Sequence, residues 1–145
     1  MPRSDHDLAT EFLNAMAARD SDTLRQILSE DVVWHTPPST MPAFRGPHVG
    51  RAAAIALITE AGGSLFVAGT QRIAPMMIVA EGGLVAVQFR MTAQTASGRD
   101  YDNQYAFFFR CEGGQIAEIW ENVDTGYVYG VFGIEPTWIN GTDKA

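Results

Sequence analysis

The sequence predicts an α+β fold in which a curved sheet folds over helices. Apolar residues recur at helical spacing as far as Gly63, and from Leu65 onward apolar and polar residues alternate in long stretches. Glycine-containing turns separate these stretches, as at Gly113-Gly114. Helices followed by antiparallel strands pack as layers around one core. The chain of 145 residues is therefore expected to form a single domain over residues 1–145, with residues 140–145 as a frayed tail.

Three helices are predicted before the strands. Ser4 with Asp7 three residues later is typical of a capping box at the start of the first helix. The second helix begins near Asp20. Pro47 opens the third helix and Gly62-Gly63 ends it. Their expected buried faces are Leu8, Phe12, Ala15 and Met16; Leu24, Ile27 and Leu28; and Val49, Ala53, Ala56 and Leu57.

A short strand over residues 31–36 carries Trp34 and His35, and a proline-rich loop over residues 36–47 follows it. Loops of this length in small domains are often functional, so we expect Met41 and Phe44 to line or cover a cavity. Two further strands are predicted over residues 65–79, with a bulge at Pro75, and over residues 84–95. In the second of these, Val85, Val87, Phe89, Met91 and Ala93 share one face.

The stretch from Asp100 to Asp124 reads as two long strands joined by a tight turn. One face of the first strand carries Asn103, Tyr105, Phe107 and Phe109, as the wall of a half-buried pocket would. A turn of Gly113 and Gly114 alone brings Glu118 and Trp120 to that face. A three-residue turn that includes Glu112 instead places Tyr105 opposite Glu121 and Phe107 opposite Ile119. A slip of one residue reverses every side chain, and we favour the three-residue turn.

In that register Glu121 is the one charged residue among apolar neighbours, which disfavours its charged form and makes it a usable acid or base near neutral pH. His35 and Tyr105 are the other candidate catalytic residues, the first as a base or donor at the loop edge and the second as an O–H donor. Each of these residues also has an ordinary structural interpretation. The residues expected to contact a substrate are Trp34, Asn103, Phe107, Ile119, Phe12, Phe44 and Met41.

Composition excludes several function classes. The net charge is −7 and no basic patch is visible, which argues against nucleic acid and anionic membranes as partners. The single Cys111 excludes an internal disulfide and a thiolate metal cluster, and the three histidines lack ligand spacing, so no metal or cofactor is expected. No signal peptide and no apolar run long enough to span a bilayer is visible, which predicts a cytoplasmic protein.

Several motifs together resemble the nuclear-transport-factor-2-like superfamily, in its SnoaL-like and ketosteroid-isomerase-like branch. They are Leu28-Ser-Glu-Asp-Val-Val-Trp34, Arg45-Gly46 at the end of the loop, Asn103-x-Tyr105, Phe109-Arg-Cys-Glu-Gly-Gly-Gln-Ile116 and Glu121-Asn-Val-Asp-Thr125. The resemblance implies a sheet curled as a cone around the N-terminal helices and an apolar pocket, frequent homodimers through the sheet, and enzymes that need no cofactor. Members include isomerases, dehydratases, cyclases and epoxide hydrolases, besides binding domains.

The chain departs from two branches of that family. Phe12 and Thr36 stand where ketosteroid isomerases would have a tyrosine and an aspartate base. Residues 116–124 are similar to the last strand of limonene-epoxide-hydrolase-like proteins, and Glu121 stands at the position of a catalytic carboxylate. The second carboxylate of those proteins is missing here, and Arg90 is expected outside the cone. The favoured hypothesis is acid–base chemistry of the isomerase, lyase or cyclase type on a small apolar or aromatic molecule. The alternatives are epoxide opening and ligand binding without catalysis.

Overall fold

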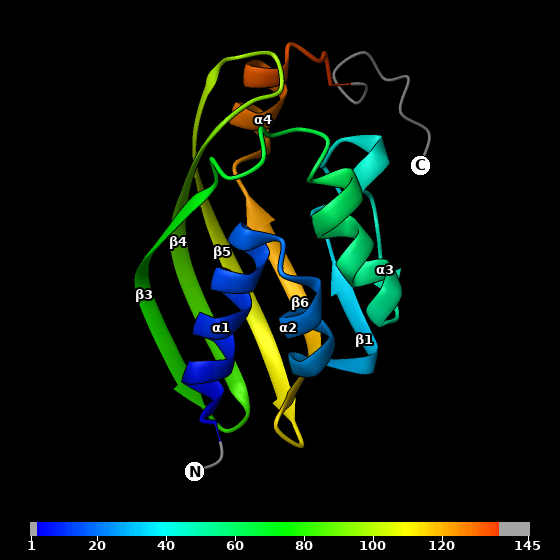
Figure 1. Ribbon diagram of the computed structural model, residues 1–145, viewed down its shortest axis with the longest axis vertical. Coiled ribbons are helices and arrows are strands. Elements are labelled where there is room, and N and C mark those ends of the chain that lie inside the picture. The colour runs from blue at the N-terminus through cyan, green and yellow to red at the C-terminus, as the bar shows by residue number, and fades with distance from the viewer. Residues whose placement is uncertain (1–2, 137–145) are drawn as a thin grey trace.

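The computed structural model describes residues 3–136, and within them three α-helices pack on one face of a six-stranded open sheet and a fourth lies at one end of it (Figure 1). The sheet order is β2-β1-β6-β5-β4-β3, with β1 and β6 parallel and the other neighbours antiparallel. The strands are β1 (Leu28–His35), β2 (His48–Val49), β3 (Arg72–Glu81), β4 (Leu84–Gln94), β5 (Asp100–Glu112) and β6 (Gln115–Val123). This confirms the predicted α+β class and the cone-like curvature.

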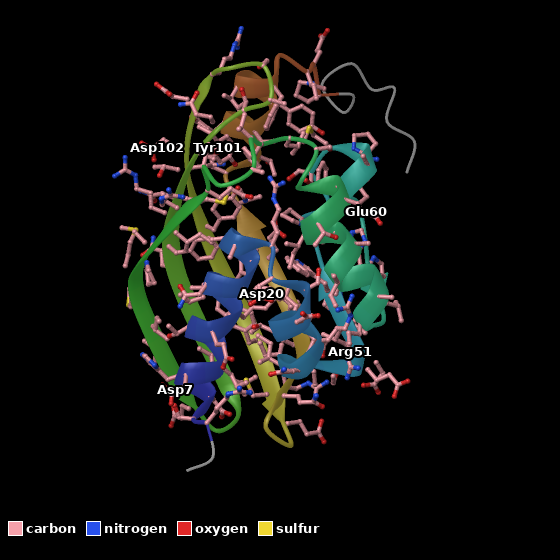
Figure 2. All side chains as sticks on the ribbon, viewed as in Figure 1. Asp7, Asp20, Arg51, Glu60, Tyr101 and Asp102 are labelled. Atoms are coloured by element: carbon pink, nitrogen blue, oxygen red, sulfur yellow. The ribbon has the colours of Figure 1, made fainter. Side chains whose placement is uncertain are left out.

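The helices are α1 (Asp5–Ala18), α2 (Ser21–Ile27), α3 (Arg51–Ala56) and α4 (Thr125–Phe132), with a π-helical turn η2 (Leu57–Ala61) after α3 and a single 3-10 turn η1 (Pro42–Phe44) in the proline-rich loop. Figure 1 shows α1, α2 and α3 over the sheet and α4 at one end of it. The Ser4–Asp7 capping box is formed as predicted. Asp20, labelled in Figure 2, caps α2 by accepting from the Thr23 N–H.

Three predicted boundaries are wrong. The first strand begins at Leu28 instead of Asp31, so Leu28 belongs to β1 and not to the second helix. The third helix begins at Arg51 instead of Pro47, because residues 48 and 49 form β2 and pair with β1. Val49 is consequently 66 % exposed, and the buried side of this segment consists of Ala54, Ile55, Leu57 and Ile58. The strand expected from residue 65 begins at Arg72; before it, Phe66 makes only an isolated bridge to Thr95. The bulge near Pro75 is confirmed.

The β5–β6 hairpin has the predicted faces but a different register. Gly113 and Gly114 alone form the turn, both with positive φ, and Glu112 pairs with Gln115. Arg110 then pairs with Glu118 and Cys111 with Ile116, so Ala117 is an extra residue in β6. This bulge places Phe107 opposite Glu121 and Tyr105 opposite Val123, two residues away from the predicted pairs, while Glu121 keeps the predicted inner side.

The core lies between the sheet and the helices. Its centre is an aromatic cluster in which the Phe12 ring lies 5.6 Å from Trp34 and 5.2 Å from Phe109, centroid to centroid. Phe107 lies 5.1 Å from Phe89 in an edge-on arrangement. The inward residues of β4 are all buried, as their alternation predicts. This cluster fills one part of the cone and leaves the part toward α4 for a cavity.

Candidate active site

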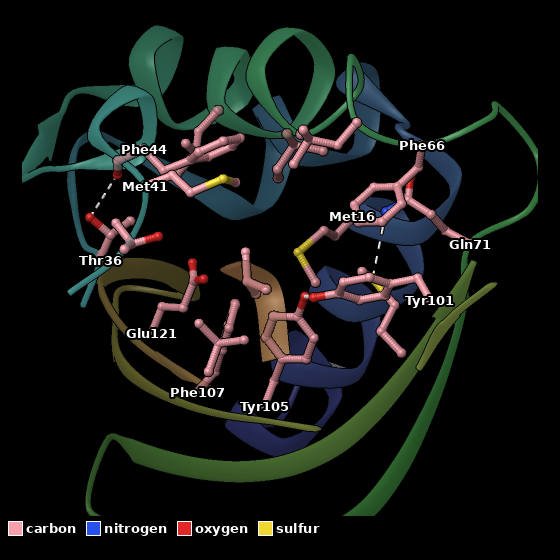
Figure 3. Close-up of a pocket in the computed structure, with 18 of the residues that line it drawn as sticks. Met16, Thr36, Met41, Phe44, Phe66, Gln71, Tyr101, Tyr105, Phe107 and Glu121 are labelled. Atoms are coloured by element: carbon pink, nitrogen blue, oxygen red, sulfur yellow. Dashed lines mark hydrogen bonds between the residues drawn. The ribbon is translucent and has the colours of Figure 1, made fainter. Parts of the chain in front are cut away.

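A cavity of about 110 Å³ lies inside the cone, between the sheet, η2, the proline-rich loop and α4 (Figure 3). Most of its lining is apolar: Met16, Trp34, Met41, Phe44, Leu57, Ile58, Gly62, Leu65, Phe66, Met91, Phe107, Val123, Val128 and Phe132. The polar residues that face it are Thr36, Thr40, Gln71, Tyr101, Tyr105 and Glu121. A concave apolar site with a few convergent polar groups is the usual form of a small-molecule site.

Glu121 is the one charged side chain in the lining formed by residues 3–136. Its carboxylate projects from β6 into the cavity near Thr36 (Figure 3). The Trp34 Nε1–H donates to Glu121 Oε1 at 3.1 Å. Burial raises the pKa of Glu121 to about 7, and the Trp34 hydrogen bond opposes that rise. Glu121 can therefore give or accept a proton near neutral pH.

Two tyrosine hydroxyls meet in the same cavity. Tyr101 and Tyr105 project from the inner face of β5, and their hydroxyl oxygens lie 2.5 Å apart. Burial raises the pKa of Tyr101 to about 12 and that of Tyr105 well above 10, with the Glu121 charge acting in the same direction on both. Both hydroxyls are therefore protonated at neutral pH and can serve as hydrogen-bond donors.

The structure brings six of the ten residues singled out in the sequence to the cavity wall. They are Glu121, Tyr105, Trp34, Phe107, Phe44 and Met41. Phe44 also accepts a hydrogen bond through its backbone oxygen from the Thr36 hydroxyl at 2.8 Å, which fixes the loop against the end of β1. The expectation that the proline-rich loop contributes Met41 and Phe44 to a cavity is confirmed.

His35, expected as a base or donor at the loop edge, does not face the cavity, so the structure does not support a catalytic role for it. Trp34 points inward, so the next residue of the same strand points outward. On the outer face His35 Nε2 lies 2.6 Å from Glu118 Oε2, and the ring stacks on Trp120 at 5.6 Å. Glu118 also accepts from Arg110 at 3.3 Å. His35 is thus part of a surface ion-pair network.

Phe12, Ile119 and Asn103 are buried but are not part of the cavity wall, so the structure does not support their predicted contact with a substrate. Phe12 and Ile119 belong to the hydrophobic core beneath the cavity. Asn103 is 4 % exposed, and its amide is consumed by bonds to Tyr101, to the Asp124 backbone oxygen and to the Gln104 backbone N–H.

Sequence reasoning missed Tyr101, Thr40 and Gln71 as lining residues. Alternation along β5 contained the signal for Tyr101, because Tyr101 shares the inward parity of Asn103 and Tyr105. Gln71 had no local signal. It reaches the cavity from the loop before β3, where its side chain accepts from Arg19 Nε at 3.1 Å. Long-range packing of that kind cannot be read from spacing.

No group of three or more histidine, cysteine, aspartate or glutamate side chains is placed to hold a metal ion within residues 3–136. In the same part of the chain, none of the helices has the length and apolar character needed to cross a membrane. The polar contacts at the cavity join Thr36 to the Phe44 backbone oxygen, Tyr101 to Tyr105, and Asn103 to Tyr101.

The fold is shared with solved structures of low sequence identity. A nuclear-transport-factor-2-like protein of unknown function from Burkholderia pseudomallei has a TM-score of 0.77 and 22 % identity, over 88 % of this chain and 97 % of that one. IdmH from Streptomyces antibioticus, a candidate polyketide cyclase, has a TM-score of 0.74 and 20 % identity, over 91 % and 100 % of the two chains. A candidate isomerase from Rhodopseudomonas palustris has a TM-score of 0.75 and 19 % identity, over 92 % and 99 %.

Among curated proteins, none matches the sequence. The predicted local similarity to limonene-epoxide-hydrolase-like proteins is not shown by these matches and stays a prediction. The family model of the SnoaL-like domain matches residues 9–119, which include most of α1, the proline-rich loop and most of the sheet. The chain therefore belongs to the SnoaL-like domain family, and it shares its fold with a nuclear-transport-factor-2-like protein.

Proposed function

We propose that this protein is an enzyme that performs general acid–base catalysis on a small, largely apolar organic molecule, with Glu121 as the proton-transferring group. One observation carries the proposal: a carboxyl group with a pKa of about 7 faces an apolar cavity that also contains a pair of tyrosine hydroxyls. Burial of a carboxyl in this way costs stability, and such groups cluster at functional sites. The chemistry needs no metal ion or organic cofactor.

The reaction is the removal and return of a proton next to a carbonyl. The Glu121 carboxylate takes a proton from the carbon beside the carbonyl, and the electron pair of that C–H bond moves onto the carbonyl oxygen. A tyrosine hydroxyl donates to this oxygen as negative charge develops on it. Return of the proton to another carbon gives an isomerisation, loss of a leaving group gives an elimination, and attack on a second carbonyl gives a cyclisation.

The cavity restricts the substrate to a small and uncharged molecule. Its volume of about 110 Å³ is below the roughly 300 Å³ at which drug-sized sites begin. Lysine, arginine and histidine are absent from the lining formed by the described residues, so an anionic group would face Glu121 without a counter-charge. Met16, Met41 and Met91 give part of the wall an adaptable surface for a flat or single-ring molecule.

Epoxide hydrolysis of the limonene type remains the second enzymatic hypothesis, and the geometry favours it less. That mechanism uses two carboxylates bridged by an arginine, whereas Glu121 is the one carboxylate in the described lining. Arg90, the arginine of β4, lies on the outer face and forms a bidentate pair with Asp102. Binding of a small ligand without turnover is the non-catalytic alternative.

The test is isotope exchange in deuterated water that also contains heavy oxygen, with a panel of small ketones, enones and epoxides followed by mass spectrometry. We expect deuterium beside a carbonyl, or loss of a small fragment, with the wild type. Glu121→Gln should lower the rate at least about 100-fold while ligand affinity is kept. Glu60→Gln is the matched control, since Glu60 is exposed (Figure 2).

Four outcomes would change the assignment. Heavy oxygen in a diol would favour epoxide opening, and binding without any label or product would favour the ligand-binding domain. Equal rates for Glu121→Gln and the wild type would remove Glu121 from the mechanism. A loss of activity in Glu60→Gln as well would indicate a general effect of glutamate removal on folding.

We also propose that two copies of the chain associate through the outer face of the sheet. Met77, Val79, Leu84 and Phe108 lie on that face with 45–56 % of their surface exposed. A contiguous apolar surface of this kind marks an interaction site. Light scattering should give twice the chain mass for the wild type and the chain mass for Phe108→Glu. A monomeric wild type would contradict this assembly.

A further inference from the structure

We infer that Asn103, Tyr101 and Tyr105 form a directed hydrogen-bond chain that aims the Tyr105 O–H into the cavity, as the donor to an oxygen of a neutral carbonyl substrate. Tyr105 is the group that touches the substrate. Tyr101 and Asn103 are positioning residues that act through it. The inference deepens the proposed function and rests on it for the identity of the substrate, but the direction of the chain follows from contacts within the protein alone.

The first step is the orientation of the Asn103 side-chain amide. Its Oδ1 accepts from the backbone N–H of Gln104 at 2.9 Å. Its Nδ2 lies 3.1 Å from the Asp124 backbone oxygen, which can only accept. Exchange of the amide oxygen and nitrogen would therefore place two donors together on one side and two acceptors together on the other. Backbone groups thus fix the amide in one orientation.

The second step is the bond from Asn103 to Tyr101. With the amide fixed, Nδ2 is the group that faces the Tyr101 hydroxyl, at 3.1 Å, and it can only donate. Its two protons go to the Asp124 oxygen and to the Tyr101 oxygen. Tyr101 is 2 % exposed and its hydroxyl oxygen already accepts from Asn103, so we assign its own O–H proton to the nearest acceptor oxygen. Within residues 3–136 the acceptor in reach is the Tyr105 oxygen, at 2.5 Å.

The third step is the direction of the Tyr105 proton. Because the Tyr105 oxygen accepts from Tyr101, its own proton points elsewhere, and Tyr105 lines the cavity. Figure 3 shows the Tyr105 and Tyr101 hydroxyls meeting in the cavity that also receives the Glu121 carboxylate. A hydrogen bond accepted by an O–H group polarises that group and strengthens its own donation, by roughly 10–30 % per bond.

The rings are held so that this geometry exists before a ligand arrives. Tyr105 stacks on Phe89 with a centroid distance of 5.0 Å and an interplanar angle of 1°. Tyr101 packs edge-on against Phe66 at 4.8 Å and against Tyr127 at 5.4 Å. Donors fixed in advance stabilise a developing oxyanion without a further cost of reorganisation. The cavity therefore has a proton acceptor, Glu121, and an oxygen site at Tyr105.

The test uses cyclohexenone with an isotopic label at its carbonyl carbon and records infrared difference spectra of the bound ketone. With the wild type we expect the carbonyl stretch at lower frequency than in an apolar solvent. Tyr105→Phe should remove this shift and weaken binding about tenfold. Tyr101→Phe and Asn103→Leu should keep part of the shift and weaken binding about twofold to threefold. Tyr127→Phe is the matched control with a wild-type spectrum, because it keeps the ring that packs against Tyr101 and removes only a hydroxyl that binds the Asp102 backbone N–H outside the cavity wall.

The direction of the chain decides the outcome. If Tyr101→Phe removes the carbonyl shift and Tyr105→Phe retains it, Tyr101 is the donor to the substrate. The hydrogen-bond chain then has the opposite direction and the inference is overturned. A larger shift in Tyr101→Phe would show that Tyr105 normally donates to Tyr101, and would overturn it as well. Should Asn103→Leu fail to fold, the two tyrosine variants still decide, since each keeps its ring. A wild type that does not bind cyclohexenone, or one that binds it without a carbonyl shift, counts equally against the inference.

The same spectra separate this inference from the proposed function. Glu121→Gln should abolish deuterium exchange and leave the carbonyl shift in place. If no exchange is found with any substrate but the tyrosine variants behave as expected, the oxygen site stands and acid–base catalysis fails. If exchange depends on Glu121 but the carbonyl shift is independent of Tyr105, the enzyme assignment stands and the inferred hydrogen-bond chain is wrong.

Discussion

Replacement of Glu121 by glutamine should make the protein more stable at alkaline pH and less active. In the folded protein the pKa of Glu121 rises from 4.5 to about 7, so the folded state binds a proton more tightly than the unfolded state. The contribution of Glu121 to the free energy of unfolding is therefore fully present below its pKa in the unfolded chain. It is lost as the pH rises from 4.5 to about 7. At about 1.4 kcal/mol for each pKa unit, the loss reaches about 3 kcal/mol above pH 7.

Glutamine has nearly the same shape and carries no titrating proton, so the variant does not lose this stability. We expect its free energy of unfolding to rise relative to the wild type by about 2–3 kcal/mol between pH 5 and pH 8. Urea unfolding of both proteins at the two pH values measures the difference. The control is Glu60→Gln, whose offset from the wild type should be equal at both pH values. An equal offset for Glu121→Gln as well would refute the raised pKa and the basis of the proposed catalysis.

Three further predictions follow from the contacts of single side chains. Trp34→Phe removes the N–H that stabilises the Glu121 carboxylate, so the pKa of Glu121 should rise above about 7. The midpoint of the pH–rate profile should then move to higher pH, and an unchanged midpoint would contradict this. Phe12→Ala deletes a fully buried ring and should lower the free energy of unfolding by about 3–5 kcal/mol in urea titrations, whereas a loss below 1 kcal/mol would show that the core closes around the gap. Arg90→Ala breaks an exposed pair with Asp102 and should leave both the isotope-exchange rate and the unfolding midpoint unchanged.

Much of the fold was predictable because β4 and β5 alternate strictly. Every second residue from Val85 to Ala93 is buried, and the same parity on β5 places Tyr105 and Phe107 inward. The start of α3 was not predictable, because Pro47 and the apolar residues after it fit a helix as well as they fit β2. Pairing with Val33 and Trp34 decided that point, and such pairing is long-range.

The candidate site was predictable in part, and for a similar reason. Glu121 was identified because the favoured register places it among inward apolar residues of its own strand, and Trp34 because its large ring could stack on an aromatic substrate. The hydrogen bond between them joins residues 87 positions apart, and no local pattern contains it. His35 was assigned by its chemistry alone, whereas its place next to the inward Trp34 already favoured the outer face.

The bulge at Ala117 explains how one hairpin can have an ordinary turn and still place an acid in the cavity. Gly113 and Gly114 form a two-residue turn, which on its own would bring Glu118 and Trp120 to the inner side. Ile116 is buried before the bulge and Ile119 after it, so the inward parity of β6 changes from even to odd at this point. Bulges next to functional sites commonly redirect a side chain in this way. The extra residue in β6 thus separates the surface acid Glu118 from the cavity acid Glu121, and the chemistry proposed for this protein depends on that separation.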